Sequence, residues 1–127
     1  MHELSIVMSV VDSVTESLEG RPELLAGGAR VKQVRLRVGA LSAVVEDSLQ
    51  FCYGIAIEGT RLEGSKLVVN LLPVVMHCGR CDADVELESV QSFRCPQCGE
   101  PVGDLRQGRE LEIESIEIEE PEEAVKK

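Results

Sequence analysis

The sequence predicts an α+β fold: a small mixed three-stranded sheet with two helices, interrupted by an inserted module that carries cysteines. Three observations lead to this fold class. The spacing of apolar residues switches between helical and strand periods along the chain. Four of the five cysteines form two close pairs in a segment of different composition. The core must be aliphatic, because the chain has no Trp, one Tyr and two Phe.

The first element is an amphipathic helix from Glu3 to about Leu18. Its apolar residues recur at steps of three and four: Leu4, Val7, Met8, Val11, Val14 and Leu18. Acidic residues take the opposite side: Glu3, Asp12, Glu16 and Glu19. Gly20 and Pro22 end the helix, because neither continues helical geometry well, and we expect a loop to about Gly28.

The next two elements are a strand and a second helix. Over Val31–Gly39, apolar Val34, Leu36 and Val38 alternate with arginines, which predicts a half-buried strand. Helical spacing returns from Val45 to Ile57, with acidic residues near the positive end of the helix dipole. The apolar positions of this helix are Val45, Leu49, Cys52, Tyr53 and Ala56.

Two further strands complete the predicted sheet. Lys66–Val75 is almost continuously apolar, which favours a strand covered on both faces, and Pro73 should make it leave the sheet. Leu111–Ile118 alternates apolar residues with glutamates, and a change of parity at Ser115 suggests a bulge. We expect this last strand to rejoin the first sheet.

These elements predict a division of the chain into three parts. Residues 1–75 with 109–120 form one α/β domain, and residues 76–108 form an inserted zinc-ribbon-like module held at both ends. Residues 121–127 lack apolar periodicity and are expected to be an acidic flexible tail.

The paired cysteines predict a structural zinc site. Cys78 with Cys81 and Cys95 with Cys98 are each spaced so that a tight turn points both sulfurs at one ion. Thirteen residues separate the pairs, enough for a short hairpin over 85–93. Four thiolates close the coordination shell, so catalysis at this ion is not expected. Two disulfides or four unconnected thiols are the alternative.

Neighbouring residues fit this interpretation. Gly99, and to a lesser degree Asp82, tolerate the positive φ that such turns need. His77 could replace a thiolate, but a residue next to Cys78 is expected to point away, as a solvated or outer-shell group. Cys52 is expected to be a small buried hydrophobe.

Composition argues against several functional classes. The formal charge of −10, from 23 acidic and 13 basic residues, disfavours nucleic-acid binding. No apolar run approaches the roughly 20 residues that a membrane span needs. Without an export signal we expect the reducing cytoplasm. No paired acid and base or nucleophile with histidine is evident, so no enzyme activity is expected.

The chain start, Met1-His2-Glu3, is a possible second metal site. A free terminal amine, the His2 amide nitrogen and the His2 ring Nδ1 can close fused chelate rings around one cation. Cu(II) and Ni(II) favour such tetragonal nitrogen donors, whereas zinc and magnesium do not. Taken alone the signal is weak, because Glu3 is also favoured at any helix N-terminus.

Four segments carry a family resemblance: MHELSIV, VRLRVGALSAVVEDSLQFCY, the paired CxxC turns and RELEIESIEIE. Together they resemble the HypA/HybF family of hydrogenase maturation nickel metallochaperones. The resemblance implies Ni²⁺ as cargo, bound at Met1 (terminal amine), His2 and the backbone nitrogen of Glu3. It implies Zn²⁺ in the cysteine module. Cys52 departs from the usual aromatic or aliphatic residue of the family, which affects packing and not the metals.

The resemblance also implies partners: the GTPase HypB, the [NiFe]-hydrogenase large subunit and, in some organisms, urease maturation proteins. A nucleic-acid-binding zinc ribbon is a weak rival, because residues 82–88 carry four carboxylates. An adaptor without nickel is a stronger one, since the acidic surface and the strand Leu111–Ile118 offer docking features.

Overall fold

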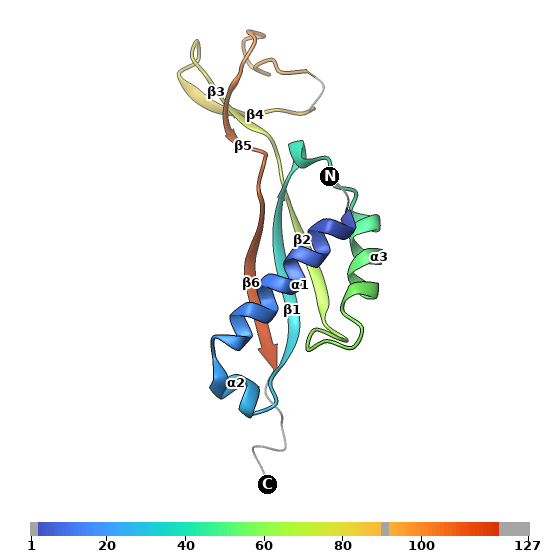
Figure 1. Cartoon of the computed structure of the whole chain (residues 1–127). Helices are drawn as coiled ribbons and strands as arrows, with labels where there is room; N and C mark the ends of the chain where they lie inside the picture. The colour runs from blue at the N-terminus through green and yellow to red at the C-terminus, as the bar shows by residue number, and fades with distance from the viewer. Residues whose placement is uncertain (1–2, 90–91, 120–127) are drawn as a thin grey trace. The chain divides into compact units, whose positions relative to one another are not determined.

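The computed structural model describes residues 3–89 and 92–119 (Figure 1). Its elements are α1 (Glu3–Glu19), α2 (Pro22–Ala26), β1 (Arg30–Gly39), the 3₁₀ helix η1 (Ala40–Ser42), α3 (Glu46–Ala56), β2 (Lys66–Leu72), β3 (Val75–Cys78), β4 (Ala83–Glu86), β5 (Asp104–Gln107) and β6 (Leu111–Glu119). The α+β class is confirmed.

The chain divides into two compact units. The described residues of 1–36, 45–68 and 113–127 form the helical unit, and those of 37–44 and 69–112 form the cysteine unit. The predicted boundaries at residues 76 and 108 stay a prediction, and residues 120–127, including the predicted tail, lie outside the described residues.

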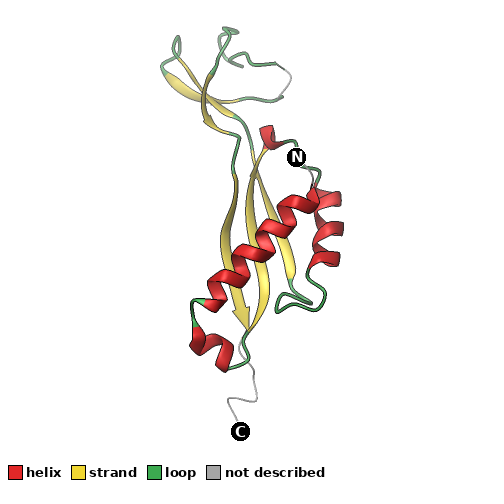
Figure 2. Ribbon diagram, viewed as in Figure 1, coloured by secondary structure: helices red, strands yellow, loops and turns green. Residues whose placement is uncertain are grey.

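Two three-stranded sheets are present, in the orders β2-β1-β6 and β4-β3-β5. In the first sheet β1 and β2 run in the same direction and are connected through α3, whereas β6 runs in the opposite direction (Figure 2). The antiparallel contact is fixed at the end of β1, where the Gly39 N–H donates to the Glu110 carbonyl at 2.8 Å. The sheet is therefore mixed, as the sequence predicted.

The helical unit buries one face of α1 and α3, which contact each other. Most of the apolar face predicted for α1 is buried, together with Ile6 and Val10, which that prediction left out. The prediction was wrong for Leu4 and Met8, which are about half exposed. They lie at the flank of the buried stripe, where helical spacing alone does not separate core from surface.

The second helix needs a smaller correction. In α3 Leu49 and Tyr53 are buried, but Cys52 is only partly buried and Val45 is exposed. Cys52 is therefore not the fully buried hydrophobe that the sequence predicted. Cys52 lies on the side of α3 between its buried face and its solvent-exposed face.

Two connections differ from prediction. The expected loop before Gly28 contains α2, which begins at Pro22, a residue whose fixed φ suits a first helical position. Strand β2 is not covered on both faces, because Asn70 and Leu71 are exposed. It is an edge strand of its sheet, in the order β2-β1-β6. The chain leaves this sheet at Pro73, as predicted, and β3 belongs to the second sheet.

Strand β6 begins beside a close approach of two glycines. A Cβ on Gly39 would lie 2.1 Å from the Gly108 carbonyl carbon and oxygen, so only glycine fits there. Along β6 the exposure alternates, then shifts phase at Glu114–Ser115, where two successive residues are exposed. This phase shift is the one that the change of parity at Ser115 predicted.

Within the described part of the chain, none of the helices has the length and continuous apolar character that a bilayer crossing requires.

Candidate metal centre

The first cysteine turn closes the hairpin between β3 and β4. These strands pair antiparallel, with Cys78 opposite Ala83, so the chain reverses over residues 79–82. Asp82 takes a φ of 52°, the positive value that the sequence led us to expect. The Cys81 N–H points at the Cys78 sulfur at 3.5 Å, a contact that holds both thiols on one side of the turn.

The second cysteine turn is built without a regular strand. The Cys95 N–H donates to the Glu100 carbonyl at 2.8 Å, and the Gly99 N–H donates back to the Cys95 carbonyl at 2.9 Å. Gly99 has the predicted positive φ, 80°. The Gln97 N–H lies 3.4 Å from the Cys95 sulfur. Two backbone hydrogen bonds thus close this turn.

The hairpin predicted over 85–93 is wrong in the part that the structure describes. Val85 and Glu86 belong to β4 and pair with β3, not with the residues before Cys95. An isolated antiparallel bridge between Arg94 and Pro101 flanks the second turn instead. Each cysteine turn is therefore flanked by its own antiparallel pairing, β3 with β4 at the first turn and Arg94 with Pro101 at the second.

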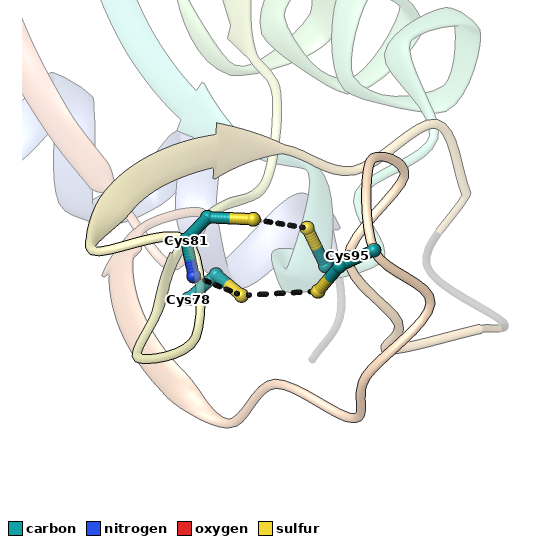
Figure 3. A group of neighbouring side chains, drawn as sticks. Cys78, Cys81 and Cys95 are labelled. Atoms are coloured by element: carbon teal, nitrogen blue, oxygen red, sulfur yellow. Dashed lines mark hydrogen bonds between the residues drawn. The ribbon is translucent and has the colours of Figure 1, made fainter.

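The four sulfurs converge on one point. All four lie within 4.8 Å of one another. The sulfurs of Cys78 and Cys98 are 3.6 Å apart. Those of Cys81 and Cys95, both labelled in Figure 3, are 3.9 Å apart. A disulfide would require about 2.05 Å, and all these cysteines are free. A tetrahedron with metal–sulfur bonds of about 2.3 Å places its sulfurs roughly 3.8 Å apart, so the spacing fits a tetrahedral ion.

The thiols perturb one another's acidity. Hydrogen bonding to the Cys98 thiol raises the pKa of Cys81 to about 12. The backbone N–H of Cys98 stabilises the Cys95 thiolate and lowers the pKa of Cys95 to about 7. Without a cation, the cluster therefore favours thiolate at one position and thiol at another. Four thiolates this close require a positive ion between them.

The cluster is part of the core of the cysteine unit. The Cys78 and Cys95 side chains are 1% and 2% exposed, while Cys81 and Cys98 are half-buried. The other buried members of this core are Val74, Met76, Val85, Leu87 and Val102. So few apolar residues stabilise a module weakly by themselves, which is the situation in which a structural metal contributes folding free energy.

His77 is outside the four-sulfur group. Its Nδ1 lies 2.9 Å from an Asp84 carboxylate oxygen, on the neighbouring strand β4. The sequence predicted a solvated or outer-shell role, and this contact agrees with a histidine turned to a carboxylate.

The predicted nickel residues are described only in part. Met1 and His2 lie outside the described residues. Glu3 begins α1, and its Oε2 accepts a hydrogen bond from the Val45 N–H at 3.0 Å. Val45 is the residue just before α3, so Glu3 joins the starts of the two helices. No sequence pattern indicated this contact, because 42 positions separate the partners.

Comparison with known proteins identifies the family of this chain. Residues 1–118 match the family model HypA, described as "Hydrogenase/urease nickel incorporation, metallochaperone, hypA". The hydrogenase maturation factor HypA of Chloroflexus aurantiacus is 43% identical over 117 residues, covering 92% of this chain and 98% of that protein. The factor of the same name from Roseiflexus sp. strain RS-1 is 44% identical over 119 residues, covering 94% and 93%.

Two solved structures share the fold. The solution structure of the Ni metallochaperone HypA from Helicobacter pylori aligns with a TM-score of 0.58 at 20% identity, covering 95% of this chain and 100% of that one. A second solution structure of a HypA protein aligns with a TM-score of 0.64 at 20% identity, covering 94% and 97%. Family match and fold agree over nearly the whole chain, and the protein therefore belongs to the HypA family of hydrogenase maturation nickel metallochaperones.

Proposed function

We propose that this chain binds Ni(II) at its amino end and delivers it for maturation of [NiFe]-hydrogenase. The ligands are the Met1 amine, His2 and the backbone nitrogen of Glu3. The observation that carries the proposal is the Met1-His2-Glu3 start of a chain that matches a nickel-incorporation family from residue 1 to 118. The work is selective binding and transfer, without a covalent step.

Donor chemistry separates the two metals. Ni(II) rewards a near-planar set of nitrogen donors, which the chain start offers. Zinc prefers a tetrahedral thiolate set, which the four converging cysteines offer. We assign Zn²⁺ a structural role at Cys78, Cys81, Cys95 and Cys98, with His77 outside the shell. Each site therefore disfavours the other ion.

The start of α1 is compatible with amide coordination. An α-helix leaves the N–H groups of its first turn without an acceptor inside the helix. Removal of the Glu3 amide proton by nickel therefore breaks no hydrogen bond within α1, which begins at Glu3. The Glu3 carboxylate meanwhile contacts the Val45 N–H, so the side chain acts as a tether while the backbone serves the metal.

The family assignment also suggests which proteins this chain binds. We propose that the GTPase HypB and the hydrogenase large subunit take part in transfer, in the cytoplasm. Delivery to urease maturation proteins is a second destination, supported by the family description of hydrogenase and urease nickel incorporation.

Nickel titration of three variants tests the ligand assignment. His2→Ala should lower Ni(II) affinity by at least about tenfold, because the imidazole ring is lost. Extra residues before Met1 should have a similar effect, because the free amine is lost. His77→Ala is the matched control and should bind nickel like the native chain. Equal binding by native, His2→Ala and extended chains would instead favour an adaptor without a nickel role.

A further inference from the structure

The outward sides of α1 and α3 expose four large apolar side chains. Leu4 and Met8 on α1 are 51% and 48% exposed, and Phe51 and Ile55 on α3 are 71% and 54% exposed. The members of each pair are four residues apart, so each pair forms one row on its helix. The two helices contact each other within the helical unit (Figure 1). We call these four residues the helix rows.

The helix rows continue the buried core outward. On α3, partly buried Cys52 and Ala56 share a flank between the buried residues and the row of Phe51 and Ile55. On α1, Met8 is three residues from buried Val11. The exposed side chains therefore extend a continuous apolar arc on each helix. Extended apolar surface of this kind marks an interaction site more often than single scattered residues do.

The charges on the same two helices favour a positively charged binding partner for the helix rows. Neither helix contains Lys or Arg. Their carboxylates are Glu3, Asp12, Glu16 and Glu19 on α1, and Glu46 and Asp47 on α3. A second copy of this chain would place like charges opposite one another, which is costly. An anionic lipid surface has the same disadvantage.

We propose that the helix rows dock a cationic amphipathic helix of a partner protein. Its apolar face would pack on the rows, and its flanking Lys or Arg side chains would face the carboxylates of α1 and α3. A helix fits better than a strand, because side chains at four-residue spacing form ridges that pack between the ridges of another helix. A strand would instead need a sheet edge.

Docking on the helix rows would also bear on nickel transfer, because the rows begin close along the chain to the proposed nickel ligands. Leu4 is three residues after Met1 in the sequence, so an occupant of the rows would bind close along the chain to the proposed nickel ligands. This consequence rests on the nickel site proposed above, whereas docking itself does not. A receiving protein that docks there would bring its own ligands close to the metal.

A binding experiment with a synthetic probe tests the surface. The probe is a labelled amphipathic helical peptide with Leu on one face and Lys on the other, titrated with the zinc-loaded full chain. The comparison peptide has Glu in place of every Lys. We expect the Lys peptide to bind at least about tenfold tighter, with the difference shrinking as salt is added.

Variants of exposed residues locate the binding. Phe51→Ser with Ile55→Ser, and separately Met8→Ser, should each weaken binding of the Lys peptide, the double variant by at least about tenfold. Leu71→Ser is the matched control, since Leu71 is 56% exposed but lies on β2. It should bind the peptide like the native chain. Circular dichroism and thermal melting should give native values for all three variants.

Three results would overturn the proposal. The first is unchanged binding of the Lys peptide by both the double variant and Met8→Ser, and the second is equal binding of the two peptides. The third is a native dimer in sedimentation that the double variant converts to monomer, because the rows would then be covered by a second copy. The peptide titration needs no nickel, so its failure is distinct from loss of nickel binding at the chain start.

Discussion

At the scale of single residues, the Glu3 side chain makes a contact that is separate from the backbone role that we propose for this residue at the nickel site. The carboxylate accepts the Val45 N–H just before α3, where a negative charge is also favoured by the helix dipole. The helix that presents the chain start is thereby fixed to its neighbour. In the proposed nickel site the same residue supplies a backbone nitrogen, which leaves this side-chain contact intact.

Glu3→Ala should lower the free energy of unfolding by about 0.5–1 kcal/mol, because it removes an exposed capping contact. Glu3→Gln should lose less, since its carbonyl oxygen still accepts the hydrogen bond. Urea unfolding measures both changes. Asp12→Ala, at an exposed position of the same helix, is the control. The tether would be refuted by equal losses for Glu3→Ala and Asp12→Ala.

The thiol pKa values predict the pH dependence of metal binding in the cysteine unit. The pKa of Cys81 is raised to about 12, so this thiol is protonated in the metal-free protein at neutral pH. Zinc must displace that proton, and zinc affinity should therefore rise as pH rises from about 6 to 8. Competition with a zinc chelator measures the slope. An affinity independent of pH over this range would contradict the assignment.

At the scale of secondary structure, glycine and proline residues determine where strands come together and where a strand ends. Gly39 and Gly108 allow β1 and the approach to β6 to come together, and Pro73 ends β2 before the chain enters the second sheet. These residues act through the backbone: the glycines have no Cβ that would block the close approach, and the proline has no N–H to donate within a sheet.

Gly39→Ala should destabilise the protein by about 2–3 kcal/mol, because the new methyl group would meet backbone atoms that cannot move aside like a side chain. Gly54→Ala is the matched comparison. A Cβ at Gly54 meets nothing within 4 Å in α3, so this change should stabilise the helix by about 0.5–1 kcal/mol. Denaturant unfolding should therefore shift in opposite directions. A Gly39→Ala variant as stable as the native chain would contradict the close approach.

Much of the element order could be predicted from local patterns. The alternation at Val34, Leu36 and Val38 and the cysteine spacing each depend on neighbouring residues only, and both were confirmed. The exposure of Leu4 and of β2 could not be predicted, because it depends on which faces the helices and sheet leave uncovered. The contact of Glu3 with Val45 likewise depends on how α1 and α3 pack.

At the scale of the whole molecule, two kinds of stabilisation coexist. The helical unit buries an aliphatic stripe of α1, the alternate apolar residues of β1, and Leu49 and Tyr53 of α3. The cysteine unit has a small core in which Cys78 and Cys95 are themselves buried members. The first kind of unit has an apolar core of its own, whereas the structural role that we propose for zinc makes the second depend on an ion among its cysteines.

Removal of zinc by a strong chelator should therefore unfold the β4-β3-β5 sheet and leave α1 and α3 protected. Amide hydrogen exchange distinguishes the two regions within one sample. Exchange of the amides of Met76 and Val85 should accelerate by orders of magnitude, while that of Val14 and Leu49 should change little. Uniform loss of protection throughout the chain would contradict this separation.

We propose that nickel and zinc occupy chemically different sites of one chain. X-ray absorption at the nickel edge of protein carrying one zinc and one nickel ion tests it most directly. We predict nitrogen and oxygen donors around nickel, with no sulfur, and a zinc edge that shows four sulfurs in the same sample. Sulfur scattering around nickel would contradict the claim, because it would place the cargo among Cys78, Cys81, Cys95 and Cys98.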